Sequence, residues 1–474
     1  MRKTTQLIPQ SSWTGICVLT LLTFASLGFA PTTASAQNTI DLKIEFAKGE
    51  QTQIKCDVAH NGSVVLLNEE NSQILRLPLD VDAKLNFFQL INGSNQAIRY
   101  YDSAAATIKI KDGVTQPALG NTNQLIVARL KSDSGELVDL ASMTGTLEQP
   151  ELELLQNQAD PLTLANVFSK TNVKEGDKWK PSTKALAKLL RVHEITGSSV
   201  ELLLKKLDKK SAKVYIMGSV AANVDDVTTK MDISGIALID LPSNLLSNLK
   251  LSIRQQRGPG QVAPGFEGKS KIDIRVTQAK SPKLTQESLA KLTQNRKIRQ
   301  RVQWVSDANF VVTYEPRWKM IMAESDAALM RYIDKDELLA QCNIVQLPSR
   351  PANNPLTLEA YKKEVAKIVA ADESASLVSA TQVPPTSNGN TAMRVVVAGL
   401  EEGLAVNWHY YHIADKDGRQ MTFVFTLAES VSNRVGSVAM RLVNEFEFRP
   451  APKVVTPAAA GESAKKMAPT TRKR

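Results

Sequence analysis

The chain of 474 residues contains only three cysteines, four histidines and 5% aromatic residues. Three cysteines are too few for a disulfide scaffold or for a thiolate-ligated zinc or iron–sulfur array. The scarcity of histidine argues against a histidine-built metal cluster, and the scarcity of aromatic rings argues against a stacking platform for nucleic-acid bases. The sequence also holds no G-x-S-x-G nucleophile elbow, no Walker loop and no H-E-x-x-H motif. We therefore expect no catalytic residue, no bound cofactor and no metal, and we expect the chain not to be an enzyme.

Long apolar runs are also absent, except near the start of the chain. Residues 1–36 begin with two basic side chains and no acid, continue through a short apolar run and end in the triplet Ala34-Ser35-Ala36. This is the pattern of a secretory signal, and the apolar run is shorter than the ~20 residues that a membrane-spanning helix needs. We expect cleavage between Ala36 and Gln37, with Ala34 as the second recognition residue. The mature chain is therefore expected to be exported, as a soluble periplasmic or extracellular protein.

The formal net charge of +10 lies mainly at the two ends of the chain. The tail, residues 451–474, is rich in Ala, Pro, Thr and Lys, and it holds too few apolar side chains to fold by burying them. We expect a disordered basic tail. Such a tail either has no partner or makes weak, screened contacts with an anionic envelope surface. Export removes nucleic acid from the expected partners.

The expected mature chain keeps two cysteines, Cys56 and Cys342. Export permits a disulfide, but the two residues are distant in sequence and belong to different predicted domains. Both lie in apolar, strand-like runs, where burial would raise the thiol pKa and remove nucleophilic character. We expect two small buried hydrophobic residues and no bridge.

Residues 37–280 alternate apolar and polar side chains with the period of two that is typical of half-buried strands. A break at Gly49-Glu50 between 40–46 and 51–59 predicts a hairpin, and Asp133-Ser134-Gly135 predicts another. Further strands are expected at 75–81, 125–130, 137–140, 198–207, 212–221, 227–239 and 272–276, with short helices at 151–156 and 161–169. The range is expected to be an all-β domain, an antiparallel sandwich or half-barrel with its polar face outward.

This first domain resembles a family of secreted bacterial proteins of unknown function. The shared features are Lys48-Gly49-Glu50 after the first strand and a later Gly-Asp-x-Trp element, here Gly176-Asp177-Lys178-Trp179. The resemblance implies an all-β, export-side domain and no activity. Trp179 is expected to be a core or rim aromatic after a glycine turn rather than a ligand platform.

A basic stretch follows the predicted all-β domain. Residues 281–304 carry six lysine and arginine side chains against Glu287 alone, and Leu289, Leu292 and Val302 provide only a thin apolar face. We expect a basic connector helix. Binding of an anionic partner by this helix is the alternative interpretation.

Residues 305–450 combine strand and helix periods. The expected strands lie at 310–314, 318–322, 342–347, 392–398, 404–414 and 420–427. Thr357 is expected to cap a helix whose buried face carries Leu358, Tyr361, Val365, Ile368 and Val369. A second helix is expected from Val431, Val435, Val438 and Leu442, before Phe446 and Phe448 end the sheet. Antiparallel strands with helices packed on one face make an α+β domain.

This second domain resembles the PsbP/DcrB-like fold. The resemblance rests on the order of elements and on Trp408-His409-Tyr410-Tyr411-His412-Ile413, then Gly418-Arg419-Gln420, then Phe423-Val424-Phe425-Thr426. It implies an α+β fold over 305–450. Members of that superfamily are mostly accessory or binding proteins, so it also implies a role without catalysis, although function does not follow from fold alone.

His409 and His412 are the most tempting pair of metal ligands. In a strand, positions i and i+3 point to opposite faces, so these imidazoles are not expected to share a metal. We expect only one of the two to face inward. His60 and His193 are isolated in the sequence.

Three acidic clusters are candidate cation sites. Asp415-Lys416-Asp417-Gly418 lacks the third oxygen ligand and the twelfth-position glutamate of a calcium loop, so a hairpin turn is expected. Asp225-Asp226 is expected to be a solvated turn. Asp334-Lys335-Asp336-Glu337 is expected to begin a helix.

These features favour an exported, non-catalytic envelope protein that acts through an unknown protein partner. The alternative is a carrier whose β-rich domain holds a lipid or other apolar ligand, suggested by a sheet that can curl and by apolar runs such as 85–91. A hydrolase built from His193 or His409 with a serine and a carboxylate is the third class considered.

Overall fold

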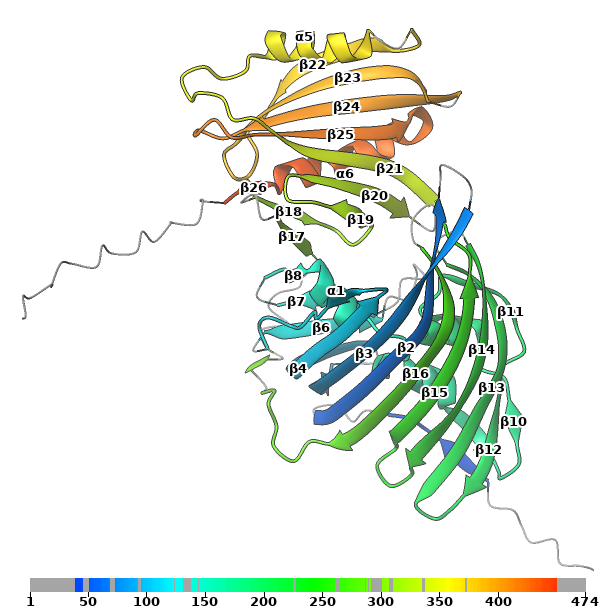
Figure 1. The fold of residues 1–474 in the computed structure, drawn as a ribbon. Helices are drawn as coiled ribbons and strands as arrows, with labels where there is room; N and C mark the ends of the chain where they lie inside the picture. The colour runs from blue at the N-terminus through cyan, green and yellow to red at the C-terminus, as the bar shows by residue number, and fades with distance from the viewer. Residues whose placement is uncertain are drawn as a thin grey trace, which may run out of the picture. The chain divides into compact units, whose positions relative to one another are not determined.

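The computed structural model describes sixteen stretches of the chain. They are residues 39–45, 51–68, 73–92, 95–122, 124–130, 138–143, 145–224, 227–260, 264–285, 287–288, 290, 301–306, 310–334, 337–370, 373–401 and 403–449. The expected signal peptide with Ala34, Ala36 and Gln37, the Lys48-Gly49-Glu50 motif, Asp225-Asp226 and the tail at 451–474 lie outside the described residues. Strands predominate in what is described, and the helices are short (Figure 1).

The largest element is a 13-stranded sheet in which every neighbouring pair is antiparallel. Its main path, in order across the sheet, is β10 (Lys178–Trp179), β12 (Glu201–Leu207), β13 (Ser211–Val224), β14 (Val227–Asp240), β15 (Leu245–Arg257), β16 (Gly265–Gln278), β2 (Gln51–Asn68), β3 (Gln73–Ile91), β4 (Gln96–Ile110), β6 (Leu125–Leu130) and β7 (Val138–Ser142). Off this path, β11 (Glu194–Ser198) pairs with β13, and β5 (Gly113–Thr115) pairs with β4.

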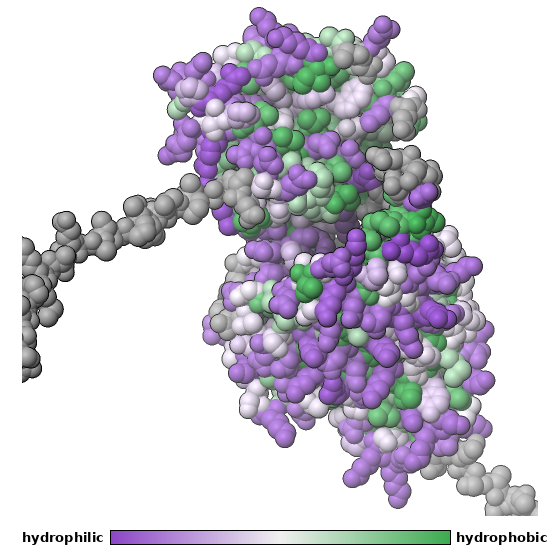
Figure 2. Space-filling view, viewed as in Figure 1, coloured by the Kyte–Doolittle hydropathy of each residue, from purple (hydrophilic) through white to green (hydrophobic). Residues whose placement is uncertain are grey.

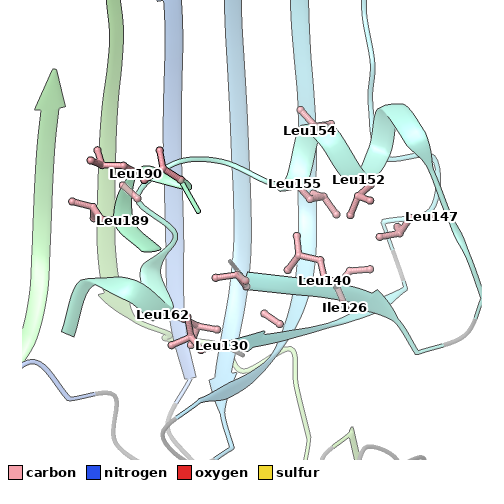
Figure 3. Packing of buried hydrophobic residues seen from close by; sticks show 14 of the residues in the cluster. Ile126, Leu130, Leu140, Leu147, Leu152, Leu154, Leu155, Leu162, Leu189 and Leu190 are labelled. Atoms are coloured by element: carbon pink, nitrogen blue, oxygen red, sulfur yellow. The ribbon is translucent and has the colours of Figure 1, made fainter. Parts of the chain in front are cut away.

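The sheet curves around three helices, α1 (Gln149–Leu155), α2 (Pro161–Phe168) and α3 (Thr183–Leu190) (Figure 1). We call the face that packs on them the inner face and the opposite one the outer face. Along β2, the even positions Ile54, Cys56 and Val58 are buried on the inner face. Figure 3 shows leucines of α1 and α2 near apolar side chains of β6 and β7, and the leucines of α3 beside other strands of the sheet. The all-β prediction is confirmed in its half-barrel form, because one curved sheet and its helices enclose the core.

One predicted hairpin is wrong and another is confirmed. Strand β1 (Ile40–Leu42) pairs with β9 (Lys170–Val173) in a separate two-stranded sheet rather than with β2. The physical reason is that both edges of β2 are taken, one by β3 and the other by β16. The hairpin between β6 and β7 forms as the sequence predicts. Helix α3 was not expected; Ser182 caps it by accepting a hydrogen bond from the Ala185 amide.

A small sheet joins strands from distant parts of the chain. Its order is β26 (Glu447–Phe448), β18 (Phe310–Tyr314), β17 (Val302–Ser306) and β8 (Leu147–Glu148), with β8 and β17 parallel. Residues 302–304, the end of the predicted connector helix at 281–304, therefore belong to a strand. Val302 is buried there, since its side chain joins the apolar core instead of a thin helix face. Residues 281–285 are not helical, and half of the predicted helix lies outside the described residues.

The C-terminal part holds a seven-stranded antiparallel sheet. Its order is β19 (Trp318–Ala323), β20 (Ala327–Asp334), β21 (Glu337–Leu347), β25 (Gln420–Ala428), β24 (Leu404–Ala414), β23 (Thr391–Glu401) and β22 (Ser376–Val383). Two helices accompany it, α5 (Leu358–Val369) and α6 (Ser432–Asn444), the latter after a 3-10 turn, η1 (Glu429–Val431). Thr357 caps α5 by accepting a hydrogen bond from the Ala360 amide. The predicted α+β class is confirmed.

The two helices pack on opposite faces of this sheet rather than on one. Tyr361 and Val365 of α5 pack against Val395 and its neighbours on β23. Helix α6 packs on the other face, with apolar side chains such as Leu442 in the same core as Phe423. The arrangement follows from the strand period of two: both faces of β23, β24 and β25 carry large apolar side chains, and each face needs its own cover.

Candidate functional site

Strand β24 places its two histidines on opposite faces of the sheet, as the spacing predicts. The ring of His412 lies 5.3 Å from that of Tyr361 on α5, and its Nε2 is 2.8 Å from Oε1 of Gln420. His409 lies on the other face, where burial, with help from the cation of Arg394, lowers its pKa to about 4. The expectation that only one histidine faces inward is wrong: both are buried, since each face of the sheet is covered by a helix.

The Asp415–Gly418 segment forms the turn between β24 and β25. The Oδ1 atom of Asp415 accepts hydrogen bonds from the amides of Asp417 and Arg419, at 3.0 and 2.9 Å, and Oδ2 accepts one from Nε of Arg419 at 2.8 Å. Gly418 has φ +83°, the left-handed conformation that the turn needs. The carboxylate is thus fully engaged in closing the turn.

The remaining candidate residues are dispersed. Cys56 and Cys342 are unbridged and buried, on β2 and β21. Burial, with a smaller contribution from Asp160, raises the pKa of Cys56 to about 12, and burial raises that of Cys342 as well. Asp334 ends strand β20, and Glu337 begins β21, so the predicted helix start is wrong: the two pair across a hairpin. Among the described residues no group of three or more His, Cys, Asp and Glu side chains is placed to hold a metal ion.

A contact between His60 and Ser270 was not foreseen. Nδ1 of His60 is 2.6 Å from Oγ of Ser270 on the inner face of the sheet. Burial alone lowers the pKa of His60, so the imidazole is neutral at neutral pH. A serine hydrolase also needs an acid that orients the histidine, and no carboxylate contributes to the shift of this pKa. We therefore interpret His60 and Ser270 as a polar contact between side chains of the otherwise apolar inner face.

The charged centre of the β-rich part is a buried ion pair that the sequence analysis missed. Arg99 on β4 contacts both carboxylate oxygens of Asp160, at 2.8 and 2.6 Å, and donates through Nε to Gln89 at 2.9 Å. Asp160 also caps α2, because its Oδ1 accepts a hydrogen bond from the Leu162 amide at 3.0 Å. Burial works to lower the pKa of Arg99, yet Asp160 and Tyr101 together hold it above its ordinary value. The pair ties α2 to the sheet.

The apolar run at 85–91 is packed into two cores. Leu85, Phe87 and Ile91 point to the inner core, while Phe88 and Leu90 belong to a second core on the outer face. The run is buried on both faces because the segment around Leu284 covers this part of the outer face. The apolar surface that remains open lies further along the same strand.

We define the open apolar face by side chains at the far ends of β2, β3 and β4 and the near end of β16. Its members are Val64, Leu66, Leu75, Leu77, Leu79, Val81, Ile110 and Phe266. Leu75 and Ile110 are 50% and 39% exposed, and the others are half-buried. None belongs to the packed cores found among the described residues.

The strand register places these side chains on the inner face. Along β3, odd positions point inward. Ala83 pairs with Val58 in the core, and Leu77, six residues away along the strand, pairs with Val64. From Val81 to Leu75 the face extends about 20 Å, and four neighbouring strands give it a width of about 15 Å. The inner face thus continues past its helices as an apolar surface that none of the described segments packs against.

Comparisons with known proteins assign neither a family nor a function. No protein-family model and no curated protein sequence matches the chain. Among solved structures, it is similar to cyanobacterial PsbP from Synechocystis (15% identity, 31% of this chain and 91% of that chain, TM-score 0.26). It is also similar to lipovitellin (8% identity, 51% of this chain and 27% of that chain, TM-score 0.28). A third similar structure is the immunity protein TplEi from Pseudomonas aeruginosa (11% identity, 46% of this chain and 74% of that chain, TM-score 0.20). The described residues contain no helix long and apolar enough to cross a bilayer.

Proposed function

We propose that this chain is an exported, non-catalytic binding protein whose β-rich part carries a lipid on the open apolar face. The observation that supports this most directly is the row of unpacked leucines and valines on the inner face beyond the helices. Contiguous exposed apolar surface is costly in water at about 25 cal/mol per Å². Such surface is therefore typical of a binding site rather than of an ordinary soluble face.

An acyl chain fits this face better than a peptide does. A peptide that joins a sheet needs a free strand edge, and most of this face is already paired: β2 pairs with β16 over Thr52–Val65, and β3 pairs with β4 over Leu79–Ile91. No member of the open apolar face is charged, and the neighbouring His60 is neutral. An acyl chain needs only van der Waals contact and exclusion of water, which a face about 20 Å long supplies along its length.

The expected secretory signal supplies the setting for this role. Residues 1–36 predict export, and a lipid outside the cytoplasm that crosses water needs a protein to cover its chains. The proposal therefore has two independent parts, export and apolar binding, and each is tested separately. Cell fractionation with N-terminal sequencing tests the first: a mature N-terminus at Gln37 supports it, and an intact Met1 in the cytosol contradicts it.

Native mass spectrometry of envelope-purified protein tests the second part. We expect stoichiometric lipid on the natural chain and its loss from the variant Leu77→Gln/Leu79→Gln. The matched control is Met217→Gln, because Met217 is 51% exposed but lies on the outer face of β13. Lipid that remains bound to the double variant, or is lost equally from the control, contradicts the assignment of the site.

A protein-interaction role is the second candidate and rests on a different surface. Ile368, Leu400 and Leu404 of the C-terminal part are 62%, 51% and 67% exposed. The amide of Leu400 donates to Oγ of Ser374 at 3.3 Å, which brings the segment after α5 beside the β23–β24 turn. Lipid-free protein, together with an envelope complex on native gels that Leu400→Asn/Leu404→Asn removes, favours this role over the carrier.

A further inference from the structure

We infer that the outer face of the large sheet holds a binding site for a phosphate-type oxyanion, formed around Arg254 and Lys269. This site lies on the face opposite the open apolar face, so it does not depend on the proposed lipid carriage. It occupies a hollow of about 830 Å³ over β14, β15, β16 and β2. Its lining residues are Asn61, Asp232, Ile233, Ser234, Ser252, Arg254, Gln255, Gln256, Glu267, Gly268 and Lys269.

The strand period determines which atoms line the hollow. Arg254, Lys269 and Asn61 alternate with the inward-facing Ile253 and Ser270, so their side chains project from the outer face. Ile233, Gln255 and Gly268 also line the hollow, and because they lie at inward-facing positions we infer that they do so through main-chain atoms. Hydrophilic side chains predominate over this part of the sheet (Figure 2).

The decisive feature is a pair of like charges placed directly across from one another. Arg254 on β15 is the register partner of Lys269 on β16. Cross-strand partners have Cβ atoms about 4.5–5.5 Å apart, and like charges in such positions repel each other. Within the described residues, neither side chain forms a hydrogen bond or an ion pair. On its other side Arg254 is the register partner of Asp232 on β14, so this carboxylate is a neighbour of the cation pair, but no ion pair joins Asp232 to either cation.

The acids around the hollow are occupied by other partners. Asp232 accepts a hydrogen bond from Oγ of Ser219 at 2.7 Å. The carboxylate of Glu267 accepts hydrogen bonds from Nε and Nη2 of Arg76, at 3.1 and 3.0 Å. Asn61, across from Lys269, donates to Asp80 at 2.7 Å, which keeps that carboxylate outside the hollow. Glu267 is thus neutralised by Arg76, and Asp80 lies outside the hollow, whereas Asp232 accepts from a neutral hydroxyl through Oδ1 and keeps its charge beside Arg254.

The free donors match the needs of an oxyanion. A guanidinium presents a planar fork of N–H groups to two oxygens, and an ammonium adds a compact point charge. The hydroxyls of Ser234 and Ser252 and the amide of Gln256 supply neutral donors at the rim of the hollow. An anion bridging Arg254 and Lys269 would replace their mutual repulsion with two charge-assisted contacts.

Phosphate occurs both as a free ion and as a lipid headgroup, and the test separates these sources. Inorganic phosphate is titrated into the mature full-length protein by calorimetry, and vesicles with phosphatidylglycerol or with phosphatidylcholine alone are tested by co-sedimentation. Three chains are compared: the natural one, Arg254→Gln/Lys269→Gln, and the control Lys55→Gln, which alters a cation on the outer face of β2 away from the hollow. Circular dichroism confirms that each variant folds.

We expect saturable binding to the natural chain that weakens at least tenfold in the double variant and is unchanged in the control. Dependence on Arg254 and Lys269 with inorganic phosphate identifies a free-ion site, and dependence only with phosphatidylglycerol vesicles identifies a headgroup site. The inference is overturned if neither probe binds the natural chain saturably, or if binding is equal in all three chains.

Discussion

At the scale of single residues, the buried pair of Arg99 and Asp160 is the most consequential contact of the β-rich part. Arg99 is 1% exposed and Asp160 7%, so neither charge has access to water. The carboxylate serves two purposes, since it neutralises Arg99 and also caps α2. A charge left alone at this depth is costly, whereas a neutral pair of similar shape is tolerated.

This predicts a specific pattern in a pair of variants. Arg99→Met leaves Asp160 buried without its cation, and we expect the free energy of unfolding to fall by about 3–5 kcal/mol. Arg99→Met/Asp160→Asn removes the stranded charge while keeping a side chain that caps helices, so we expect it to recover a large part of this loss. Urea unfolding followed by circular dichroism measures both. Equal destabilisation of the two variants would contradict the argument.

His409 predicts a pH dependence of stability. Burial, aided by Arg394, lowers its pKa from 6.5 to about 4, so at pH values between these limits the unfolded chain binds more protons than the folded one. The contribution of neutral His409 to the free energy of unfolding is fully present above about pH 6.5. It is lost as the pH falls towards 4, by an amount on the order of 3 kcal/mol. His409→Gln should flatten the stability curve in this window. Parallel curves for the variant and the natural chain would disprove the prediction.

At the scale of elements, the turn between β24 and β25 shows how one glycine fixes a connection. Gly418 has φ +83°, and a Cβ atom there would lie 1.9 Å from the carbonyl oxygen of Arg350. That carbonyl is held nearby, because the amide of Arg350 donates to the carbonyl of Gly418 at 2.9 Å. A side chain at this position thus meets both a strained dihedral and a main-chain obstruction.

A matched pair of alanine variants separates these two effects. Gly403 in the β23–β24 turn also has φ +83°, but a Cβ atom there would meet nothing within 4 Å. We expect Gly403→Ala to lose about 1–2 kcal/mol from the left-handed dihedral alone. Gly418→Ala is expected to lose more, because the turn must also move away from Arg350. Thermal unfolding of both variants measures the difference, and equal losses would rule out the obstruction.

Helix α5 shows how an accurate element prediction can miss the exposure of one side chain. Thr357 caps the helix as expected, and Tyr361 and Val365 are buried as expected. Ile368, which the periodicity places on the same face, is 62% exposed. It lies at the flank of the apolar stripe in the last turn of the helix, where burial depends on the extent of the sheet beneath rather than on the helical period.

At the scale of the whole molecule, strand β3 divides into a part that stabilises the fold and a part that is available for binding. Leu85 is 4% exposed within the inner core, whereas Leu77 and Leu79, further along the same face, are outside it. Surface that function requires is often surface that stability does not use. The proposed lipid site and the packed core therefore lie on one continuous face.

This division predicts that substitutions along β3 lower the free energy of unfolding by unequal amounts. Leu85→Ala should lower the free energy of unfolding by about 2–5 kcal/mol, because it opens a cavity in a packed core. Leu77→Gln should change it by no more than about 0.5 kcal/mol, as for a substitution outside the core. Urea unfolding of lipid-free protein measures both. A loss at Leu77 as large as that at Leu85 would place Leu77 in the core and remove the open apolar face.

The sequence alone determined much of the local structure, since local structure follows from neighbouring residues. The alternation along residues 404–414 predicted β24 with its bounds, and the periods around Val365 and Val435 predicted α5 and α6. The opposite facing of His409 and His412 also followed from the strand period. These results needed no knowledge of which segments meet in space.

Only the tertiary structure decided which faces are buried and which strands pair. Strand β2 lies between β3, its neighbour in sequence, and β16, about two hundred residues away, and no local signal specifies that choice. The same long-range pairing brings Arg99 to Asp160, sets Arg254 across from Lys269, and leaves Leu77 open on the inner face. A pattern of alternation gives a strand two faces, but only the curvature of the assembled sheet and the positions of its helices determine what each face contacts.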